Sequence, residues 1–359
     1  MSTIAQQLVE VTGGVDTHKD THTAAAVDSV GRVLGAEQFE ATAAGYRQLV
    51  SWLRSFGVLV LVGVEGTGAY GAGLARYLRE QEVAVVEIDR QDRKARRWQG
   101  KSDPVDAEAA ARAALSARRT GIPKQRDGRV ESLRSLRVAR RSAVQQRADV
   151  SRQMKALIVS APEELRAAVR ELGDRQLIFT CAAWRPDARR AGDPVVAGRM
   201  ALRTLARRHQ RLAQEIDELD EVIAPLVTDI APRLLALNGV GADVAGQLLV
   251  TVGDNPERLR SEAAFAMLCG AAPLPASSGR TQRHRLNRGG DRAANAALYR
   301  IVLCRLRWDP RTRSYMERRT KEGLSKKEII RCLKRYIARE IYQLITASTT
   351  NGRQLTTAA

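Results

Sequence analysis

The sequence has little of what marks a membrane protein, a secreted protein or a zinc protein. No apolar run approaches the ~20 residues that a membrane helix needs. Only four of the 359 residues are cysteines, and they lie far apart without a CxxC pair, which disfavours a zinc knuckle and a disulfide framework. The N-terminus, MSTIAQQLVEVTGG, has neither a basic nor a long apolar stretch, so we expect no secretion and a reducing, cytoplasmic setting.

Aromatic residues are also scarce, at 4%, which limits stacking against nucleic-acid bases. A hydrophobic fraction of 44% and a charged fraction of 28% are nevertheless typical of a folded chain. With 359 residues, the chain is long enough for two or three domains.

Charge is unevenly distributed along the chain: acidic residues outnumber basic ones near the N-terminus and are scarce near the C-terminus. Residues 1–89 carry 6 basic and 11 acidic side chains, whereas residues 280–359 carry 20 and 6, within a total net charge of +19. A basic body attracts a polyanion and releases its counterions, and arginine, the commoner cation here, grips phosphate with two hydrogen bonds. A genome rich in G and C explains arginine over lysine but not this local excess. The pattern favours nucleic-acid binding, with a divalent metal between phosphate and the acidic head.

The first part of the chain predicts an α/β domain over residues 1–122. Strands are expected from near Val9 to His18 and over 21–29, 31–39, 58–65 and 83–89, with helices over 42–56 and 69–82. A set of antiparallel strands followed by alternating helices and strands is typical of an RNase H-like (RuvC-like) sheet.

Residues 123–228 predict a helical coiled-coil or dimerisation region. Apolar residues alternate at steps of three and four, the rhythm of a coiled coil. This seam comprises Leu202, Leu205, His209, Leu212, Ile216, Leu219 and Ile223. A weaker seam runs over 136–157, and the two seams together suggest an antiparallel helical hairpin or a dimer arm. His209 in the first seam is interpreted as a polar residue that sets the register, and not as a ligand. Pro225 should end or kink the second helix, and 181–194 should form a loop.

Residues 229–348 predict a mainly helical third domain, followed by a flexible tail over 349–359. The LNGVG step at 237–241 resembles a helix-hairpin-helix, in which Gly239 and Gly241 let backbone N–H groups approach a phosphate. An ordinary glycine-capped turn is the alternative. A loop rich in glycine, serine and arginine follows, and then two basic helices.

Four acidic residues stand at positions where one metal site can form. Asp16 follows the first strand, Glu65 ends the fourth, and Asp103 and Asp106 share one face of a helix. In an RNase H-like sheet these elements meet, and converging carboxylates repel one another unless Mg²⁺, or Mn²⁺ in its place, neutralises them. Each acid also has an ordinary explanation; Asp103 before Pro104, for example, is a good helix N-cap. The nearby residues His18 and His22 are interpreted as solvated.

The chain resembles a known family through five segments that keep the family's order. They are GVDTHKDTH (14–22), VEGTGAYG (64–71), KSDPVDAEAAARAAL (101–115), NGVG (238–241) and PLPASSGRTQRHRLNRGGDRAANAALY (273–299). They are similar to those of the DEDD insertion-sequence transposases, the group typified by insertion sequence 110 that includes the Piv-type invertases. The middle helical region matches only in character.

The resemblance implies a RuvC-like domain with Asp16, Glu65, Asp103 and Asp106 as its metal-binding tetrad. It also implies a nucleophilic serine, here Ser278 before Gly279, with Ser277 as the alternative. Members pair an element-encoded bridge RNA with donor and target DNA. They act as oligomers in which the acidic site of one protomer faces the serine of another, and we expect a dimer that assembles into a tetramer.

The residues around the serine are compatible with this chemistry. A serine hydroxyl needs a base or a metal to become a strong nucleophile, and no Ser-His-Asp set is visible. Charge on the phosphoryl group would be stabilised by the neighbouring cations Arg280, Arg283, Arg285 and Arg288.

Three functions therefore stay open at this point. The first is an RNA-guided recombinase that uses a metal and a serine. The second is a RuvC-like, Mg²⁺-dependent nuclease that cuts branched DNA with water. The third is a nucleic-acid-binding protein without catalysis. Tyr299 is a less favoured nucleophile because it lies in a helical pattern.

Overall fold

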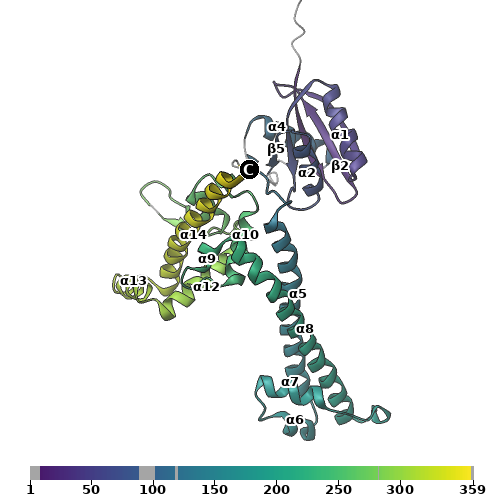
Figure 1. Ribbon diagram of the computed structural model, residues 1–359, viewed down its shortest axis with the longest axis vertical. Coiled ribbons are helices and arrows are strands. Elements are labelled where there is room, and N and C mark those ends of the chain that lie inside the picture. The colour runs from purple at the N-terminus through teal and green to yellow at the C-terminus, as the bar shows by residue number, and fades with distance from the viewer. Residues whose placement is uncertain (1–8, 89–101, 118–119, 282, 357–359) are drawn as a thin grey trace, which may run out of the picture. The chain divides into compact units, whose positions relative to one another are not determined.

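The computed structural model describes residues 9–88, 102–117, 120–281 and 283–356 (Figure 1). Contacts along the chain divide it into two compact units. The first unit comprises the described residues up to Gly128, Val252–Phe265 and those after Ser348. The second comprises Arg129–Thr251 and Ala266–Ser348.

The first unit is built on one mixed sheet of six strands in the order β3-β2-β1-β4-β5-β6. The strands are β1 (Glu10–Thr17), β2 (Thr21–Val27), β3 (Val33–Glu40), β4 (Val58–Glu65), β5 (Val85–Ile88) and β6 (Thr120–Gly121). The first three pair antiparallel, β4 and β5 join in parallel, and β6 is antiparallel at the edge. The expected strands and their order along the chain are confirmed, whereas β6 was not predicted.

Helices cover both faces of this sheet. Helices α1 (Ala43–Ser55) and α2 (Ala72–Glu80) bury leucines at helical spacing against β1 and β4, in the main core of the unit. The first of these helices begins where the Thr42 hydroxyl accepts a hydrogen bond from the Gly45 amide, an ordinary N-cap. Helix α4 (Asp103–Leu115) packs on the opposite face through its alanines.

The second unit begins with two long helices, α5 (Arg129–Val159) and α8 (Pro194–Ile230). They run antiparallel, because Arg129 pairs with Asp229 near one end and Arg140 with Asp220 further along. The predicted seam of α8 is buried or half-buried along its length. The helix does not end at Pro225, one of the two outcomes expected there, but continues to Ile230.

The remaining elements complete the two units. They are α6 (Glu163–Val169), α7 (Asp174–Ala183), η1 (Ala188–Arg190), α9 (Pro232–Leu235), α10 (Ala242–Val252), η2 (Pro256–Arg258), α11 (Glu262–Leu268), β7 (Leu274–Pro275), β8 (His284–Arg285), α12 (Arg292–Trp308), α13 (Pro310–Lys321) and α14 (Lys326–Thr356). Three helices follow the serine loop where two were expected, because Pro310 starts a new helix capped by Asp309.

Helix α14 begins with a capping box, since the Ser325 amide donates to a Glu328 carboxylate oxygen over 2.9 Å. Its apolar face is buried, as the spacing of Ile329, Leu333 and Ile337 predicts. Among the described residues, no helix is both long and apolar enough to cross a membrane.

Candidate active site

Asp16 and Glu65 lie side by side at the carboxyl ends of two neighbouring parallel strands. Val15 of β1 is in register with Val64 of β4, so the next residue on each strand is one of the two acids. The Thr17 hydroxyl donates a hydrogen bond to the carbonyl oxygen of Glu65 over 2.8 Å and ties the two strand ends together. The carboxyl ends of strands are where an open α/β sheet presents its ligands.

Two glycines set the distance between α4 and this edge of the sheet. A Cβ on Gly14 would lie 2.3 Å from the Ala107 carbonyl oxygen, and one on Gly63 would lie 2.8 Å from the Ala114 Cβ. The helix backbone therefore rests directly on β1 and β4. Since side chains alternate along a strand, residues two positions after these glycines also face α4, and these residues are Asp16 and Glu65.

Asp103 and Asp106 occupy the first turn of α4. The N-cap position is Ser102, so the ordinary explanation of Asp103 as the N-cap is wrong. Asp103 is half-exposed, whereas Asp106 is buried, with 2% of its surface accessible. The positive end of the helix dipole favours acids in the first turn. Here it stabilises the carboxylates of Asp103 and Asp106 in the presence of the nearby Asp16.

The histidine that follows β1 belongs to this cluster, although it was interpreted as solvated. His18 Nε2 lies 3.2 Å from an Asp16 oxygen and 3.4 Å from an Asp103 oxygen. One ligand atom from each of these three residues lies within 4.8 Å of the others. Glu65 and Asp106 are not part of this tightest group. The spacing in the sequence could have indicated this contact. His18 comes two residues after Asp16, and in an extended segment residues two apart lie on the same side.

The interpretation of His22 as solvated is wrong. Its ring is fully buried and stacks on Tyr46, with centroids 5.6 Å apart and planes 4° from parallel. Burial lowers the pKa of His22 below its usual value. This residue of β2 packs against Tyr46 of α1 inside the first unit.

The electrostatics of the acidic cluster suit a divalent cation. Burial raises the pKa of Asp16, and the neighbouring charges of Asp106 and Asp103 act in the same direction, whereas His18 opposes them. Carboxylate oxygens are the ligands that Mg²⁺ and Mn²⁺ prefer, and an imidazole beside them is compatible with Mn²⁺. The residues present therefore fit a divalent metal, which would relieve the repulsion that disfavours ionised Asp16.

Ser278 lies at the tip of a β-hairpin in the second unit. Strands β7 and β8 pair antiparallel, and beyond them Ser278 and Thr281 exchange backbone hydrogen bonds of 3.2 and 3.1 Å. Gly279 sits in the turn with φ of +55°, a conformation that glycine adopts readily. The expected irregular loop is thus partly a hairpin that presents its serine to solvent.

The two neighbouring serines differ in what their hydroxyls do. Ser277 Oγ accepts a hydrogen bond from the Arg283 amide over 3.2 Å and lies 3.4 Å from the Arg283 carbonyl oxygen, so it links the two arms of the hairpin. Ser278 Oγ makes no hydrogen bond with any residue that the structure describes. Ser278 is therefore the hydroxyl available to an incoming group.

The arginines predicted to bind nucleic acid follow this serine closely in the chain. All are exposed, and within the described part of the chain none of their side chains forms an ion pair: Arg280, Arg283, Arg285 and Arg288. In the LNGVG segment, Gly239 has φ of +81° and Gly241 directly precedes α10, with open space where a Cβ would lie. Arg305 donates to the carbonyl oxygen of Asn238 over 2.8 Å and holds this turn in place.

An α/β unit whose carboxylate cluster fits a divalent metal, joined to an arginine-rich helical unit with an exposed serine, is typical of enzymes that act on nucleic-acid phosphates. Two family models match the chain: the DEDD transposase model of the IS110 type over residues 13–161, and "Transposase IS116/IS110/IS902 family" over residues 231–317. Together these segments make up more than half of the chain. The chain belongs to the IS110 family of transposases.

Two proteins of insertion elements are similar to parts of the chain. An uncharacterized 42 kDa protein of insertion element IS900 from Mycobacterium paratuberculosis is 27% identical over 58% of this chain and 57% of its own length. An uncharacterized 43.6 kDa protein of insertion element IS110 from Streptomyces coelicolor is 35% identical over 26% of this chain and 23% of its own length. The chain thus matches little more than half of the first relative and a quarter of the second.

Proposed function

We propose that the protein is a DNA transposase and site-specific recombinase that cuts and rejoins DNA strands in a reaction that depends on Mg²⁺. The observation that carries this proposal is the cluster of Asp16, His18 and Asp103 at the end of β1, beside Glu65 and Asp106. Membership in the transposase family supports DNA as the substrate.

The first unit would hold the metal, and we propose a RuvC-like, RNase H-like fold for it. The ligands would be Asp16, Glu65, Asp103 and Asp106, with Mn²⁺ able to replace Mg²⁺. A bound ion of this kind supplies positive charge that polarises a phosphoryl oxygen. His18, in contact with two of the carboxylates, would orient them.

The second unit would supply the nucleophile. The Ser278 oxygen would form a bond to a DNA phosphorus while the bond from that phosphorus to one deoxyribose oxygen breaks. The serine loses its proton, and the departing sugar oxygen gains one. The energy of the phosphodiester is then kept in the serine–phosphate bond, so that a sugar hydroxyl of another strand can displace the serine and rejoin the DNA.

The partners of the reaction are part of the proposal. We propose that a structured bridge RNA, encoded by the element, selects donor and target DNA. We further propose that the protein acts as a dimer that assembles into a tetramer through a coiled coil of α5 and α8. The residues around Gly239 and Gly241 would act as a helix-hairpin-helix that holds a backbone phosphate. The division into 1–122, 123–228, 229–348 and a tail over 349–359 stays a prediction.

A nuclease that uses water is the second candidate. The observation in its favour is that the acidic cluster is formed within one unit, with no residue from the hairpin. Such an enzyme would hydrolyse branched DNA with Mg²⁺, and the serine would only donate hydrogen bonds to phosphate.

Trapping of a covalent intermediate distinguishes the two. Purified full-length protein is incubated with Mg²⁺, a labelled DNA carrying the ends of the element and the flanking non-coding RNA, and adducts are resolved on a denaturing gel. We expect a protein–DNA adduct that is absent in Ser278→Ala and in Asp16→Asn. Mass spectrometry should place the phosphate on Ser278.

The neighbouring serine is the matched control. Ser277→Ala removes a hydroxyl one residue away and should keep the adduct, at a reduced rate because the hairpin is looser. An adduct that persists in Ser278→Ala but disappears in Ser277→Ala would move the nucleophile to Ser277. Cleavage that survives both substitutions while no adduct forms would establish the water-dependent nuclease.

A further inference from the structure

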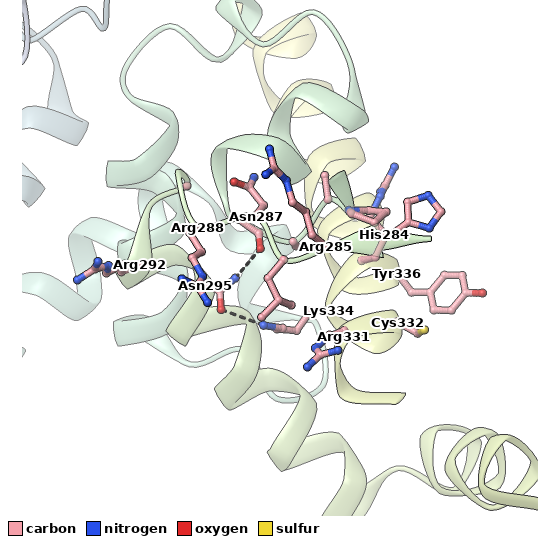
Figure 2. Close-up of a pocket in the computed structure, with 17 residues that line it drawn as sticks. His284, Arg285, Asn287, Arg288, Arg292, Asn295, Arg331, Cys332, Lys334 and Tyr336 are labelled. Atoms are coloured by element: carbon pink, nitrogen blue, oxygen red, sulfur yellow. Dashed lines mark hydrogen bonds between the residues drawn. The ribbon is translucent and has the colours of Figure 1, made fainter. Parts of the chain in front are cut away.

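A strongly cationic cavity of about 810 Å³ lies beside the serine hairpin in the second unit (Figure 2). Its walls come from residues 270–273, from the segment 284–292 that follows the hairpin, and from α14. The segment and α14 face each other across the hollow, as the labelled side chains in Figure 2 show. All the residues that line the cavity belong to the second unit.

The cavity is lined by cations and by no carboxylate. Its basic residues are Arg285, Arg288, Arg292, Arg331, Lys334 and Arg335, and no aspartate or glutamate lines it. Four of them, Arg285, Arg288, Arg292 and Arg331, form no hydrogen bond or ion pair through their side chains with a described residue.

Elsewhere in the same unit, arginines do find carboxylates. Arg137 lies 2.9 Å from Asp243, and Arg305 lies 2.8 Å from Glu340. Positive charge gathered in a concave site without compensation is expected to bind an anion. Since the cavity has no such carboxylates, its basic side chains are expected to bind an anionic ligand.

Lys334 is held so that it presents its charge to this cavity. Its Nζ donates to the Asn295 side-chain oxygen over 2.9 Å, while Asn295 Nδ2 donates to the carbonyl oxygens of Cys269 and Gly270. Burial, together with the nearby charge of Arg331, lowers the pKa of Lys334. A phosphate would remove this repulsion and favour the charged lysine.

The floor of the cavity is a fixed piece of structure. A Cβ added to Gly290 would lie 2.3 Å from the Gly270 nitrogen, so the two backbone segments cross in direct contact. The Asp291 amide donates to the Leu268 carbonyl oxygen over 2.7 Å beside this crossing. The segment that carries Arg288 is therefore anchored at its base.

Apolar groups complete the lining. Ala271, Pro273 and Leu286 lie on the loop side, and Cys332 and Tyr336 lie on α14. Leu286 and Tyr336 are each about half exposed, so they offer apolar surface to a ligand. Phosphate alone would make no favourable contact with this apolar surface, whereas a nucleotide offers both a phosphate and a flat apolar base.

We propose that this cavity binds one unpaired nucleotide of a nucleic-acid strand, with its base against Leu286 and Tyr336 and its phosphates on Arg288, Arg331 and Lys334. A base-paired duplex would not fill the site, since its bases are stacked inside the helix. The proposal rests on the proposed function only in taking nucleic acid as the substrate.

The position of the cavity gives this nucleotide a role. His284 and Arg285 line it and also form β8, which pairs with β7 at the base of the hairpin. Ser278 lies three residues beyond Pro275, which is about 10 Å of extended strand. An unpaired nucleotide held here would place the strand to which it belongs next to the serine.

Binding measured against salt tests the charged part of the site. Full-length protein is titrated with a fluorescent single strand, as DNA and as RNA of the same sequence, and with the DNA duplex. For the single strand that uses the site, we expect Arg288→Ala and Arg331→Ala each to weaken binding about tenfold and to lower the salt slope by about 0.7. Arg313→Ala, an exposed arginine on α13 that does not line the cavity, should change neither by as much.

Photocrosslinking tests where the base lies. A strand with one 5-iodouracil, as DNA or RNA, should crosslink to peptides that contain Tyr336, Cys332 or His284, and Leu286→Ala should reduce this yield several-fold without lowering the melting temperature of the protein. The arm that crosslinks identifies the source of the nucleotide as DNA or RNA. Crosslinks confined to other parts of the chain would overturn the proposal.

Two further outcomes separate this inference from the proposed function. If the variants weaken duplex and single-strand binding equally, or if Arg313→Ala has the same effect, the cavity is a general phosphate-binding surface and the inference fails while the transposase stands. If the unaltered protein binds no nucleic acid under any of these conditions, both fail. Neither assay needs strand cleavage, so loss of the covalent adduct alone leaves the inference standing.

Discussion

Gly14 of β1 and Ala111 of α4 are in backbone contact, since a Cβ on Gly14 would lie 2.0 Å from the Ala111 nitrogen. The first turn of α4 carries Asp103 and Asp106, and β1 carries Asp16. One glycine thus sets the separation between acids that lie nearly 90 residues apart in the chain.

Gly14→Val should therefore disrupt both the fold and the acidic cluster. The added side chain has to push α4 away from the sheet, and overpacking of this kind costs about 1–3 kcal/mol of unfolding free energy. Chemical denaturation of the full chain measures this loss, and titration with Mn²⁺ measures metal binding.

The matched control is a glycine in the same unit without a close neighbour. A Cβ on Gly121 meets no atom within 4 Å, so Gly121→Ala should change stability by less than about 0.5 kcal/mol. Equal effects of the two substitutions would show that the contact of α4 with β1 does not hold the acids in place.

Asp16→Asn should have opposite effects with and without metal. The pKa of Asp16 is raised in the folded protein, so its contribution to stability is present at low pH and is lost as pH rises through that pKa. At neutral pH with EDTA, the asparagine variant should melt at the same temperature as the unaltered protein or higher.

With Mg²⁺ or Mn²⁺ the order should reverse, because the ion binds only where the ionised carboxylate is present. At 100 times the dissociation constant, a ligand stabilises the folded state by about 2.7 kcal/mol. Glu37→Gln, which removes an exposed acid from β3, should respond to metal as the unaltered protein does. If metal stabilises Asp16→Asn as much as it stabilises the unaltered protein, Asp16 is not a ligand.

Much of the first unit follows from local pattern, and the reasons are physical. Alternation and continuous apolar runs predict β1 to β5 because buried strands need them, and the spacing of Leu49 and Leu53 predicts α1. The two-residue strand β6 is too short to have a pattern. The contact of α4 with Gly14 was not predictable, because a glycine in a strand does not reveal what lies above it.

The histidines show where residue type alone misleads. His18 and His22 look equivalent in HKDTH, yet one contacts two carboxylates and the other is stacked in the core. The difference is set by Tyr46 and Asp103, which come from distant segments. The roles of the two serines in the hairpin were equally undecided, because the partner of Ser277 is the backbone of Arg283 across the hairpin.

His22→Phe should remove a pH dependence of stability. The pKa of His22 is lowered by burial, so between that pKa and its usual value near 6.5 the unfolded chain binds more protons than the folded one. The protein therefore loses stability as pH falls below about 6.5, and phenylalanine, which can keep the stacking on Tyr46, should reduce this loss.

Thermal melts from pH 8 to pH 5 measure the effect as a difference between variant and unaltered protein. His209 also has a pKa lowered by burial, so part of the pH dependence should remain in His22→Phe. A variant with the same pH profile as the unaltered protein would show that His22 is protonated without cost.

Asp243→Ala should strongly destabilise the second unit. At the start of α10, this carboxylate lies 2.9 Å from Arg137, 3.5 Å from Arg140 and 2.6 Å from Arg300, and so joins α5, α10 and α12. Only 12% of the Arg137 side chain is exposed, and burial lowers its pKa. Loss of the shared acid leaves three cations together, one of them desolvated, at a cost of about 3–5 kcal/mol.

An exposed acid on α5 is the comparison. Asp149 pairs with Arg152 on the surface of the same helix, and its replacement by alanine should cost less than about 1 kcal/mol. A second substitution tests the cause: adding Arg300→Met to Asp243→Ala removes one of the stranded charges and should restore part of the stability. If the double variant loses as much unfolding free energy as the two single variants together, Asp243 does not act by relieving repulsion among these arginines.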